Sequence, residues 1–440
     1  MTKFYCLIAI SICIALFSVS CSKDTKGVDS KAVAKYQNNI PLPKDGASLP
    51  NDRRDLDLSH ISDAQMKMVE ATNRFGYSLF SNYAKEAQGQ PITVISPYSI
   101  ELCLTMFLAA LDDQSYTKFT KAMNLENIGR DELLQFYSDL TDNMVKSDEK
   151  QRIFPANIAW ISDVRKDYLP SYGETLGKYL GAEVGFIPFL PAREAVSTMN
   201  KWINLKTYGH IDKLLAPQDI ENRSLVLCNA VYFYSPWNDE FLADNTKERP
   251  FRNADGSKVM VPTMNKTTWT MRYCENNEVQ IASLPLNNNQ FSLLIVLPKS
   301  KDLSLDPSKL AEWNPIEKIG HSKTYDVEVF LPKLSTYSDK MDLGQPLMEM
   351  GFPADYVLSN LFTTQNHINN GFNVYQKTYV GWDEKGVEAA AASTVIPMPS
   401  DSNSNQEDVV LDVNRPFFFI LMHEKSSKAV FIGAVNSFNK

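Results

Sequence analysis

The amino-acid sequence predicts a single mixed α+β domain, because segments with helical and with strand character alternate along most of the chain. Apolar residues recur at helical spacing from about Ala64, and a run from Pro97 to Leu111 is apolar around most of its surface. An amphipathic helix is expected from about Ala192 to Thr207. Six segments rich in β-branched or aromatic residues predict strands: Arg223–Tyr234, Phe291–Pro298, Tyr325–Leu331, Val374–Val380, Pro416–His423 and Ala429–Val435.

Two of these predicted strands lack the alternation of polar and apolar residues. The sequences SLVLCNAVYF, within the first, and FSLLIVLP, the second, are almost continuously apolar. We therefore expect both strands to be covered on both faces. A chain of 440 residues that is 44% hydrophobic can bury a large core without disulfide bonds, and it contains no internal repeat.

The N-terminus has the layout of a secretory signal peptide. Lys3 is followed by an apolar run from Phe4 to Val19, and residues 1–20 are too short for a comfortable membrane span. Cys21 resembles the lipidated cysteine of a bacterial lipobox, although Ser18 stands where leucine is usual. The prediction is an exported cell-envelope lipoprotein, at the outer membrane or cell surface, with plain secretion as the alternative. Residues 21–62 then form a polar, lipidated tether, and residues 63–440 form the domain.

Composition argues against several classes of function. The net charge is −8 and no basic block is present, so nucleic acid is not an expected partner. Cys103, Cys228 and Cys274 would remain in the domain, and none belongs to a CxxC or Cys/His pattern, so neither a metal site nor a cofactor is predicted. An odd number of cysteines in an exported domain leaves at least one thiol unpaired.

The common catalytic motifs are also missing. The sequence contains no GxSxG, HExxH, GxxxxGK[ST] or GxGxxG motif, and its five histidines are scattered. We do not expect an enzyme.

One segment near the C-terminus is unusual. The sequence EKGVEAAAAST, residues 384–394, places four alanines after a glycine, and the polar stretch that follows contains Pro397 and Pro399. Small side chains suit a segment that must enter between two existing strands. The residues alone leave open the plainer interpretation, a surface loop with a fortuitous alanine run.

This segment resembles the hinge of the reactive-centre loop of inhibitory serpins. Further matches to that family follow in the expected order over residues 64–438, which makes the resemblance specific. They are VISPYSIELCLTMFLAAL (94–111), MNKWINLKTYGHIDKLL (199–215), LVLCNAVYFYSPWNDEF (225–241), VPTM (261–264), VEVFLPKLSTYSDKMDLGQPLMEMGF (327–352) and VNRPFFFILMHEKSSKAVFIGAV (413–435).

The resemblance implies a serpin fold with three β-sheets, about eight to nine helices and an exposed reactive-centre loop at about residues 384–414. It implies an irreversible suicide inhibitor of serine, or also cysteine, endopeptidases that acts as a monomer. The protease cleaves the loop and forms an acyl-enzyme, and the hinge then inserts into the main sheet as an extra strand. A non-inhibitory binding protein with the serpin fold is the alternative. A surface lipoprotein that captures glycan or peptide is largely excluded by the ordered motifs.

The resemblance also assigns roles to particular residues. Gly386 would give the hinge backbone freedom, and the small, uncharged Val387 favours an inhibitor. Trp237 matches a tryptophan below the point where the loop inserts, with packing as its expected role. The hinge comprises Glu384, Lys385, Gly386, Val387, Glu388, Ala389, Ala390, Ala391 and Ala392, and the breach comprises Lys333, which is expected to pair with Glu384, together with Glu384 and Trp237.

A polar cluster below the sheet opening, the shutter, is matched by Ser96, Ser99, Asn229 and Gln376. The family commonly has histidine where this chain has Gln376. Because glutamine both donates and accepts hydrogen bonds, we expect the hydrogen-bonded role to persist.

The usual hinge length in the family places the scissile bond between Ser400 and Asp401. Cleavage after Thr394, Val395, Ile396 or Met398 is the alternative, although a following proline disfavours Ile396 and Met398.

Pro397 and Pro399 lack the N–H that a central strand needs. Either they remain at the end of the inserted strand, or the cut lies upstream near Val395. No lysine or arginine occurs between Lys385 and Arg415, which predicts an elastase-like or subtilisin-like target rather than a trypsin-like one.

Overall fold

The computed structural model describes residues 61–87, 89–144, 152–207, 209–300, 303–364, 367–368, 374–387 and 409–439. The predicted signal peptide, Cys21 and most of the predicted tether lie outside these ranges. The first described helix begins at Asp63.

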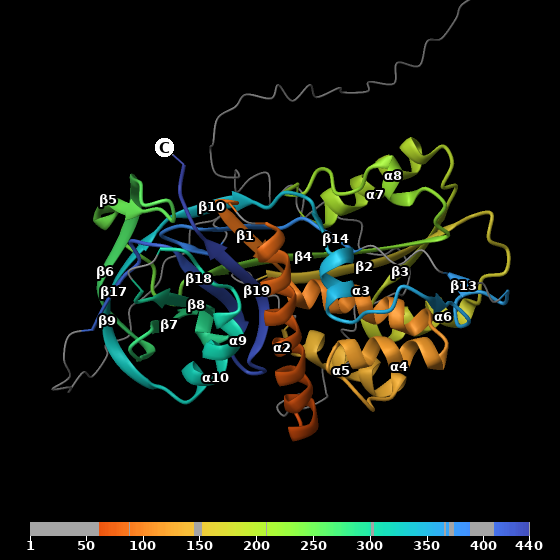
Figure 1. Cartoon of the computed structure of the whole chain (residues 1–440), viewed down its shortest axis with the longest axis horizontal. Coiled ribbons are helices and arrows are strands. Elements are labelled where there is room, and N and C mark those ends of the chain that lie inside the picture. The colour runs from red at the N-terminus through yellow and green to blue at the C-terminus, as the bar shows by residue number, and fades with distance from the viewer. Residues whose placement is uncertain are drawn as a thin grey trace, which may run out of the picture.

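A six-stranded sheet forms one layer of the molecule, in the order β10–β15–β16–β4–β2–β3. Strands β2 and β3 are parallel, and the other neighbours are antiparallel. Figure 1 shows α7 on one side of this sheet and α3 on the other. The strands are β2 (Arg152–Ser162), β3 (Glu183–Ile187), β4 (Leu225–Pro236), β10 (Leu334–Tyr337), β15 (Tyr379–Trp382) and β16 (Gly386–Val387).

The remaining long strands form a nine-stranded ladder in which β6 has a joining role. It pairs with β5 and β9 on two sides and with β7 near its end, and its register with β9 shifts between Lys266 and Trp269. Two of the three sheets expected of the fold are thereby joined through β6 into a single nine-stranded sheet. The strands are β1 (Ile92–Ile95), β5 (Lys247–Arg252), β6 (Lys258–Glu275), β7 (Val279–Leu286), β8 (Phe291–Pro298), β9 (Lys323–Pro332), β17 (Val409–Asp412), β18 (Phe417–His423) and β19 (Lys428–Val435).

Nine α-helices and the single turn α8 occur within the described ranges, together with the short 3₁₀ helices η2 (Ala243–Asn245) and η3 (Asn287–Asn289). Helix α2 begins with a reciprocal cap, because the Ser62 hydroxyl accepts from the Gln65 backbone while the Gln65 side chain accepts from the Ser62 backbone. The helices are α2 (Asp63–Glu86), α3 (Pro97–Ala110), α4 (Asp113–Ala122), α5 (Arg130–Met144), α6 (Pro170–Leu180), α7 (Ala192–Lys206), α8 (Pro217–Ile220), α9 (Lys309–Trp313), α10 (Pro315–Gly320) and α11 (Gly344–Glu349). Short strands complete the elements: β11 (Met341–Asp342), β12 (Tyr356–Val357), β13 (His367–Ile368) and β14 (Tyr375–Gln376).

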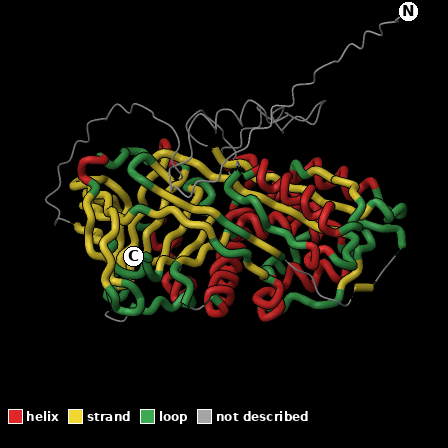
Figure 2. Tube along the Cα trace, turned by 90° about the horizontal axis from the view of Figure 1, so that it is seen from above, coloured by secondary structure: helices red, strands yellow, loops and turns green. Residues whose placement is uncertain are grey.

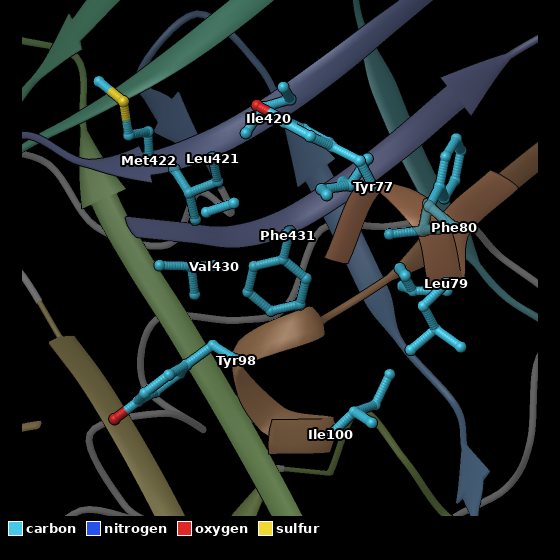
Figure 3. Packing of buried hydrophobic residues seen from close by; sticks show 14 of the residues in the cluster. Tyr77, Leu79, Phe80, Tyr98, Ile100, Ile420, Leu421, Met422, Val430 and Phe431 are labelled. Carbon is cyan, nitrogen blue, oxygen red and sulfur yellow. The ribbon is translucent and has the colours of Figure 1, made fainter. Parts of the chain in front are cut away.

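The main core lies where α2 and α3 pack against β18 and β19. Figure 3 shows Tyr77 and Phe80 of α2 in the same buried cluster as the strand residues Ile420 and Phe431. The ring of Phe80 meets that of Phe418 in β18 edge to face, with centroids 6.3 Å apart. Seen from above (Figure 2), strands are dense at the end that holds the C-terminus, and most helices lie in the other half.

The predicted fold class is confirmed, and most predicted elements are present. Strand β8 is buried along nearly its whole length, as expected. Two other predicted strands differ from expectation. The first half of β4, expected to be covered on both faces, is only half-buried because it borders a cavity. The predicted strand Val374–Val380 is divided into β14 and β15, which pair with different partners.

Two further observations concern the described part of the chain. None of its helices has the length and apolar character needed to cross a membrane. Cys103, Cys228 and Cys274 are all unpaired thiols.

Candidate functional site

The hinge begins with a tight reversal of the chain after β15. The N–H of Asp383 donates to the carbonyl of Gly386 at 3.0 Å, and the N–H of Lys385 donates to the Asp383 carboxylate at 2.9 Å. Gly386 and Val387 then run back as β16, antiparallel to both β15 and β4. The first two residues after the turn are therefore already seated between two strands of the six-stranded sheet.

Trp237 holds this turn through hydrogen bonds as well as packing. Its backbone N–H donates to the Lys385 carbonyl at 2.9 Å, and its indole N–H donates to the Asp383 carbonyl at 2.7 Å. The ring also meets Phe241 and Trp269 edge to face, with centroids 5.8 Å away in each case. Packing alone, as predicted from the sequence, is thus an incomplete account of this residue.

The carboxylate of Glu384 has two partners. Lys333 Nζ and the hydroxyl of Thr246 each lie 2.7 Å from it. Burial by itself raises the pKa of Glu384, but the hydrogen bonds from Lys333 and Thr246 outweigh burial and hold the pKa below its ordinary value. The structure therefore brings Lys333 and Glu384 together as the sequence predicted, and it adds Thr246.

Gly386 occupies a position where the backbones nearly touch. A Cβ built there would lie 2.4 Å from the carbonyl oxygen of Ser235 and 2.6 Å from the Cα of Pro236. Both atoms belong to the backbone and cannot rotate away. The glycine is required for the close approach of two strands. The backbone freedom that the family resemblance implies for it stays a prediction.

A cavity of about 210 Å³ lies below Val387, between the edges of β4 and of β14–β15. Its walls are residues 225–233 on one side and 374–381 on the other. Ser99 and Cys103 of α3 line it from one face of the sheet, and His210, which follows α7, lines it from the other. Among the described residues, no strand pairs with these two edges below Val387. We call this space the cleft.

The shutter residues meet in two pairs, one on each wall of the cleft. Beside β14, the backbone N–H of Ser96 donates to the side-chain oxygen of Gln376 at 2.9 Å, and the Gln376 amide donates to the Ser96 carbonyl at 3.1 Å. Beside β4, the hydroxyl of Ser99 donates to Asn229. The first turn of α3 therefore connects both walls, and Gln376 uses both its donor and its acceptor.

A family model described as "Serpin (serine protease inhibitor)" matches residues 70–438. The chain belongs to the serpin family. Leukocyte elastase inhibitor of Sus scrofa is 28% identical over 390 residues, which covers 84% of this chain and 100% of that protein. Iripin-2 of Ixodes ricinus is 26% identical over 388 residues, covering 84% and 94% of the two chains. Membership indicates protease inhibition as the general function, with proteases as the general kind of partner.

Solved serpin structures have the same fold. Serpin48 of Tenebrio molitor superposes with a TM-score of 0.73 at 22% identity, covering 86% of this chain and 100% of that one. The thermophilic serpin Tengpin in its native state superposes with a TM-score of 0.72 at 23% identity, covering 86% and 95%. These likenesses establish the arrangement of sheets and helices.

Part of the serpin site predicted from the sequence lies outside the described residues, and its placement stays a prediction. The residues concerned are Glu388, Ala389, Ala390, Ala391, Ala392, Thr394, Val395, Ile396, Met398, Ser400 and Asp401.

Two contributors to the serpin site were missed at the sequence level. Thr246 bonds to a carboxylate 138 positions further along the chain. Asn157 of β2 accepts from the side chain of Asn229 at 2.5 Å and so supports the shutter. No local pattern marks either residue, because each acquires its partner only when distant strands meet.

Proposed function

We propose that this serpin is an irreversible inhibitor of serine endopeptidases that acts through loop cleavage, acyl-enzyme formation and insertion of the hinge segment into the six-stranded sheet. One observation carries the proposal. Val387 is 2% exposed and sits between β15 and β4, directly above the cleft. A strand that continued from it would meet two unpaired edges.

The register of β16 supports a particular depth of insertion. Gly386 pairs with Pro236, and β4 begins at Leu225. If the same register continued downward, Pro397 would fall opposite Leu225 and Pro399 would lie beyond the end of β4. The prolines would then need no ladder hydrogen bond. Of the two alternatives from the sequence, this favours prolines at the end of the inserted strand.

The bond between Ser400 and Asp401 is the proposed site of cleavage, and this register is compatible with it. Cleavage there leaves residues 386–396 free to pair along β4. Each backbone hydrogen bond contributes about 0.5–1.5 kcal/mol net, so an inserted strand gains on the order of ten kcal/mol.

An elastase-like or subtilisin-like enzyme is the proposed target. The loop between Lys385 and Arg415 offers no basic residue to a trypsin-like pocket. The similarity to a protein named leukocyte elastase inhibitor supports the same class.

We further propose that the protein acts as a monomeric, exported lipoprotein anchored through Cys21. Labelling with a lipid precursor tests the anchor, because the unmodified sequence should be marked and Cys21→Ala should not. Equal labelling of both, or of neither, would contradict the anchor and leave the inhibitory proposal untouched.

The inhibitory proposal is tested on denaturing gels with elastase, subtilisin, chymotrypsin and trypsin. We expect a covalent complex with one of the first three and none with trypsin. Val387→Arg is the matched variant, since a charged side chain cannot take the buried place of Val387; it should be cleaved without forming a complex. Cleavage of the unmodified chain with neither a complex nor a rise in melting temperature would favour the non-inhibitory binding protein instead.

A further inference from the structure

One histidine lies over the outer face of the cleft and touches both walls. His210 belongs to the segment that follows α7, and it is 8% exposed. Its ring stacks on Tyr379 of β15, with centroids 4.3 Å apart and planes 20° apart. It also stacks against Tyr232 of β4, with centroids 6.0 Å apart and planes 25° apart. The imidazole thus lies between side chains of the two strands that border the cleft.

The segment that follows His210 makes two further contacts on the β14–β15 side of the cleft. Asp212 lies 3.6 Å from Lys377, which is two residues before Tyr379. Asp219 forms an ion pair with Lys340, whose ammonium group lies 3.9 Å from the centre of the Tyr375 ring. By contrast, α7 itself packs on the other wall, against Ile158 of β2 and Cys228 of β4.

The pairing of β16 with β4 and its pairing with β15, when continued along the loop, both place the same loop residue beside His210. Continued from the pairing of Gly386 with Pro236, the register on β4 places residue 390 opposite Tyr232. Continued from the pairing of Val387 with Trp382, the register on β15 places the same residue opposite Tyr379. Residues paired across antiparallel strands point to the same face. An inserted strand would therefore direct the side chain of residue 390 toward the imidazole of His210.

The sequence of the loop has small side chains at the positions that would lie beneath His210 in an inserted strand. Val387 is buried toward the core, so residues 388, 390, 392, 394 and 396 would face the side of the sheet where His210 lies. In that order they are glutamate, alanine, alanine, threonine and isoleucine. The two alanines coincide with the rungs beside Tyr379 and Lys377, where the segment crosses.

We infer that His210 is a positioning residue for loop insertion: it fills the side-chain space between Tyr232 and Tyr379 and limits residue 390 to a methyl group. The occupant is this chain's own loop, so the inference rests on the proposed function. Because the ring is held by aromatic contacts on both walls, a larger side chain at 390 would have to displace the whole segment. Insertion would then be slower than hydrolysis of the acyl-enzyme, and the protease would be released.

The experiment is a rescue. Ala390→Leu should slow insertion about tenfold, the rate effect of an overpacking cost of about 1.4 kcal/mol in the barrier, and convert the inhibitor largely into a substrate. Combining it with His210→Ala should restore most of the covalent complex. The matched control is Thr394→Leu, which adds bulk on the same face but falls opposite Cys228 beneath α7, and which His210→Ala should not rescue.

The readouts are the fraction of covalent complex and the melting temperature after cleavage. If the unmodified chain shows neither complex nor stabilisation, the proposed function fails. If it inserts normally but Ala390→Leu behaves like the unmodified chain, or is not rescued, only the role of His210 fails. Should His210→Ala not fold, a Gly, Ala, Ser, Leu series at 390 replaces it. The fraction of covalent complex must then decrease with side-chain size more steeply at position 390 than in the same series at position 388. Equal slopes at the two positions would overturn the inference.

Discussion

The ammonium group of Lys428 lies 2.8 Å from the carboxylate of Glu101, and both side chains are completely buried. Lys428 also donates to the hydroxyl of Thr72 at 2.9 Å, and the hydroxyl of Tyr137 donates to Glu101 at 3.1 Å. Burial raises the pKa of Glu101 and lowers that of Lys428, while the attraction between the two groups opposes both shifts. The pair joins α3, which bears the shutter serines, to β19.

Removing one member of this pair should be costly. Glu101→Gln leaves Lys428 as an uncompensated charge in the core, and the free energy of unfolding should fall by about 3–5 kcal/mol. Urea denaturation of the native protein measures the loss. The control is Glu183→Gln, which breaks the ion pair with Lys206 at 3.0 Å on the surface and should cost less than about 1 kcal/mol.

Replacing both members should have the opposite effect. The double variant Glu101→Met, Lys428→Met removes two desolvated charges, and native stability should be unchanged or rise by about 1–4 kcal/mol. A double variant as unstable as Glu101→Gln would show that the pair stabilises the core in its own right.

Acid should loosen the hinge. The pKa of Glu384 is below its ordinary value, so its contribution to stability is complete above the ordinary carboxyl pKa. That contribution is lost as the pH falls through the depressed folded value. The protection factors of the amides at residues 382–387, which correct each exchange rate for its intrinsic dependence on pH, should decrease as the pH falls through this window. Glu384→Gln should show smaller protection factors at neutral pH and a weaker dependence on pH, and an unchanged profile in that variant would contradict the assignment.

Gly386→Ala should expel β16 from the sheet. The added methyl would overlap the Ser235 carbonyl, so the amide of Val387 should lose its protection from exchange. Gly129→Ala is the matched control, since a Cβ at Gly129 meets nothing within 4 Å. Retained protection of Val387 in Gly386→Ala would mean that the contact between Gly386 and Ser235 can accommodate a methyl group without loss of strand pairing.

Gln376→Ala should weaken the junction between α3 and β14. It removes both hydrogen bonds with the Ser96 backbone, and leaving those buried groups unsatisfied costs about 1–3 kcal/mol. Thermal unfolding of the native state reports the change. Gln345→Ala removes a surface bond to Glu349 and should leave the melting temperature almost unchanged.

The sequence by itself determined the family and the order of most elements. Motifs spread from residue 64 to residue 438 identify the fold, and the helical periodicity from Ala64 corresponds to α2. It also paired Lys333 with Glu384, although 51 positions separate them, because the family resemblance supplied the spatial relation.

Only the tertiary structure decided which contacts hold the hinge and which side chain covers the outer face of the cleft. The sequence alone does not reveal that the backbone of Ser235 lies against Gly386. Likewise, the role inferred for His210 depends on its position between Tyr232 and Tyr379, which belong to two different strands. Side-chain type is local information, whereas close approach depends on which distant strands become neighbours, and packing of the whole chain determines that.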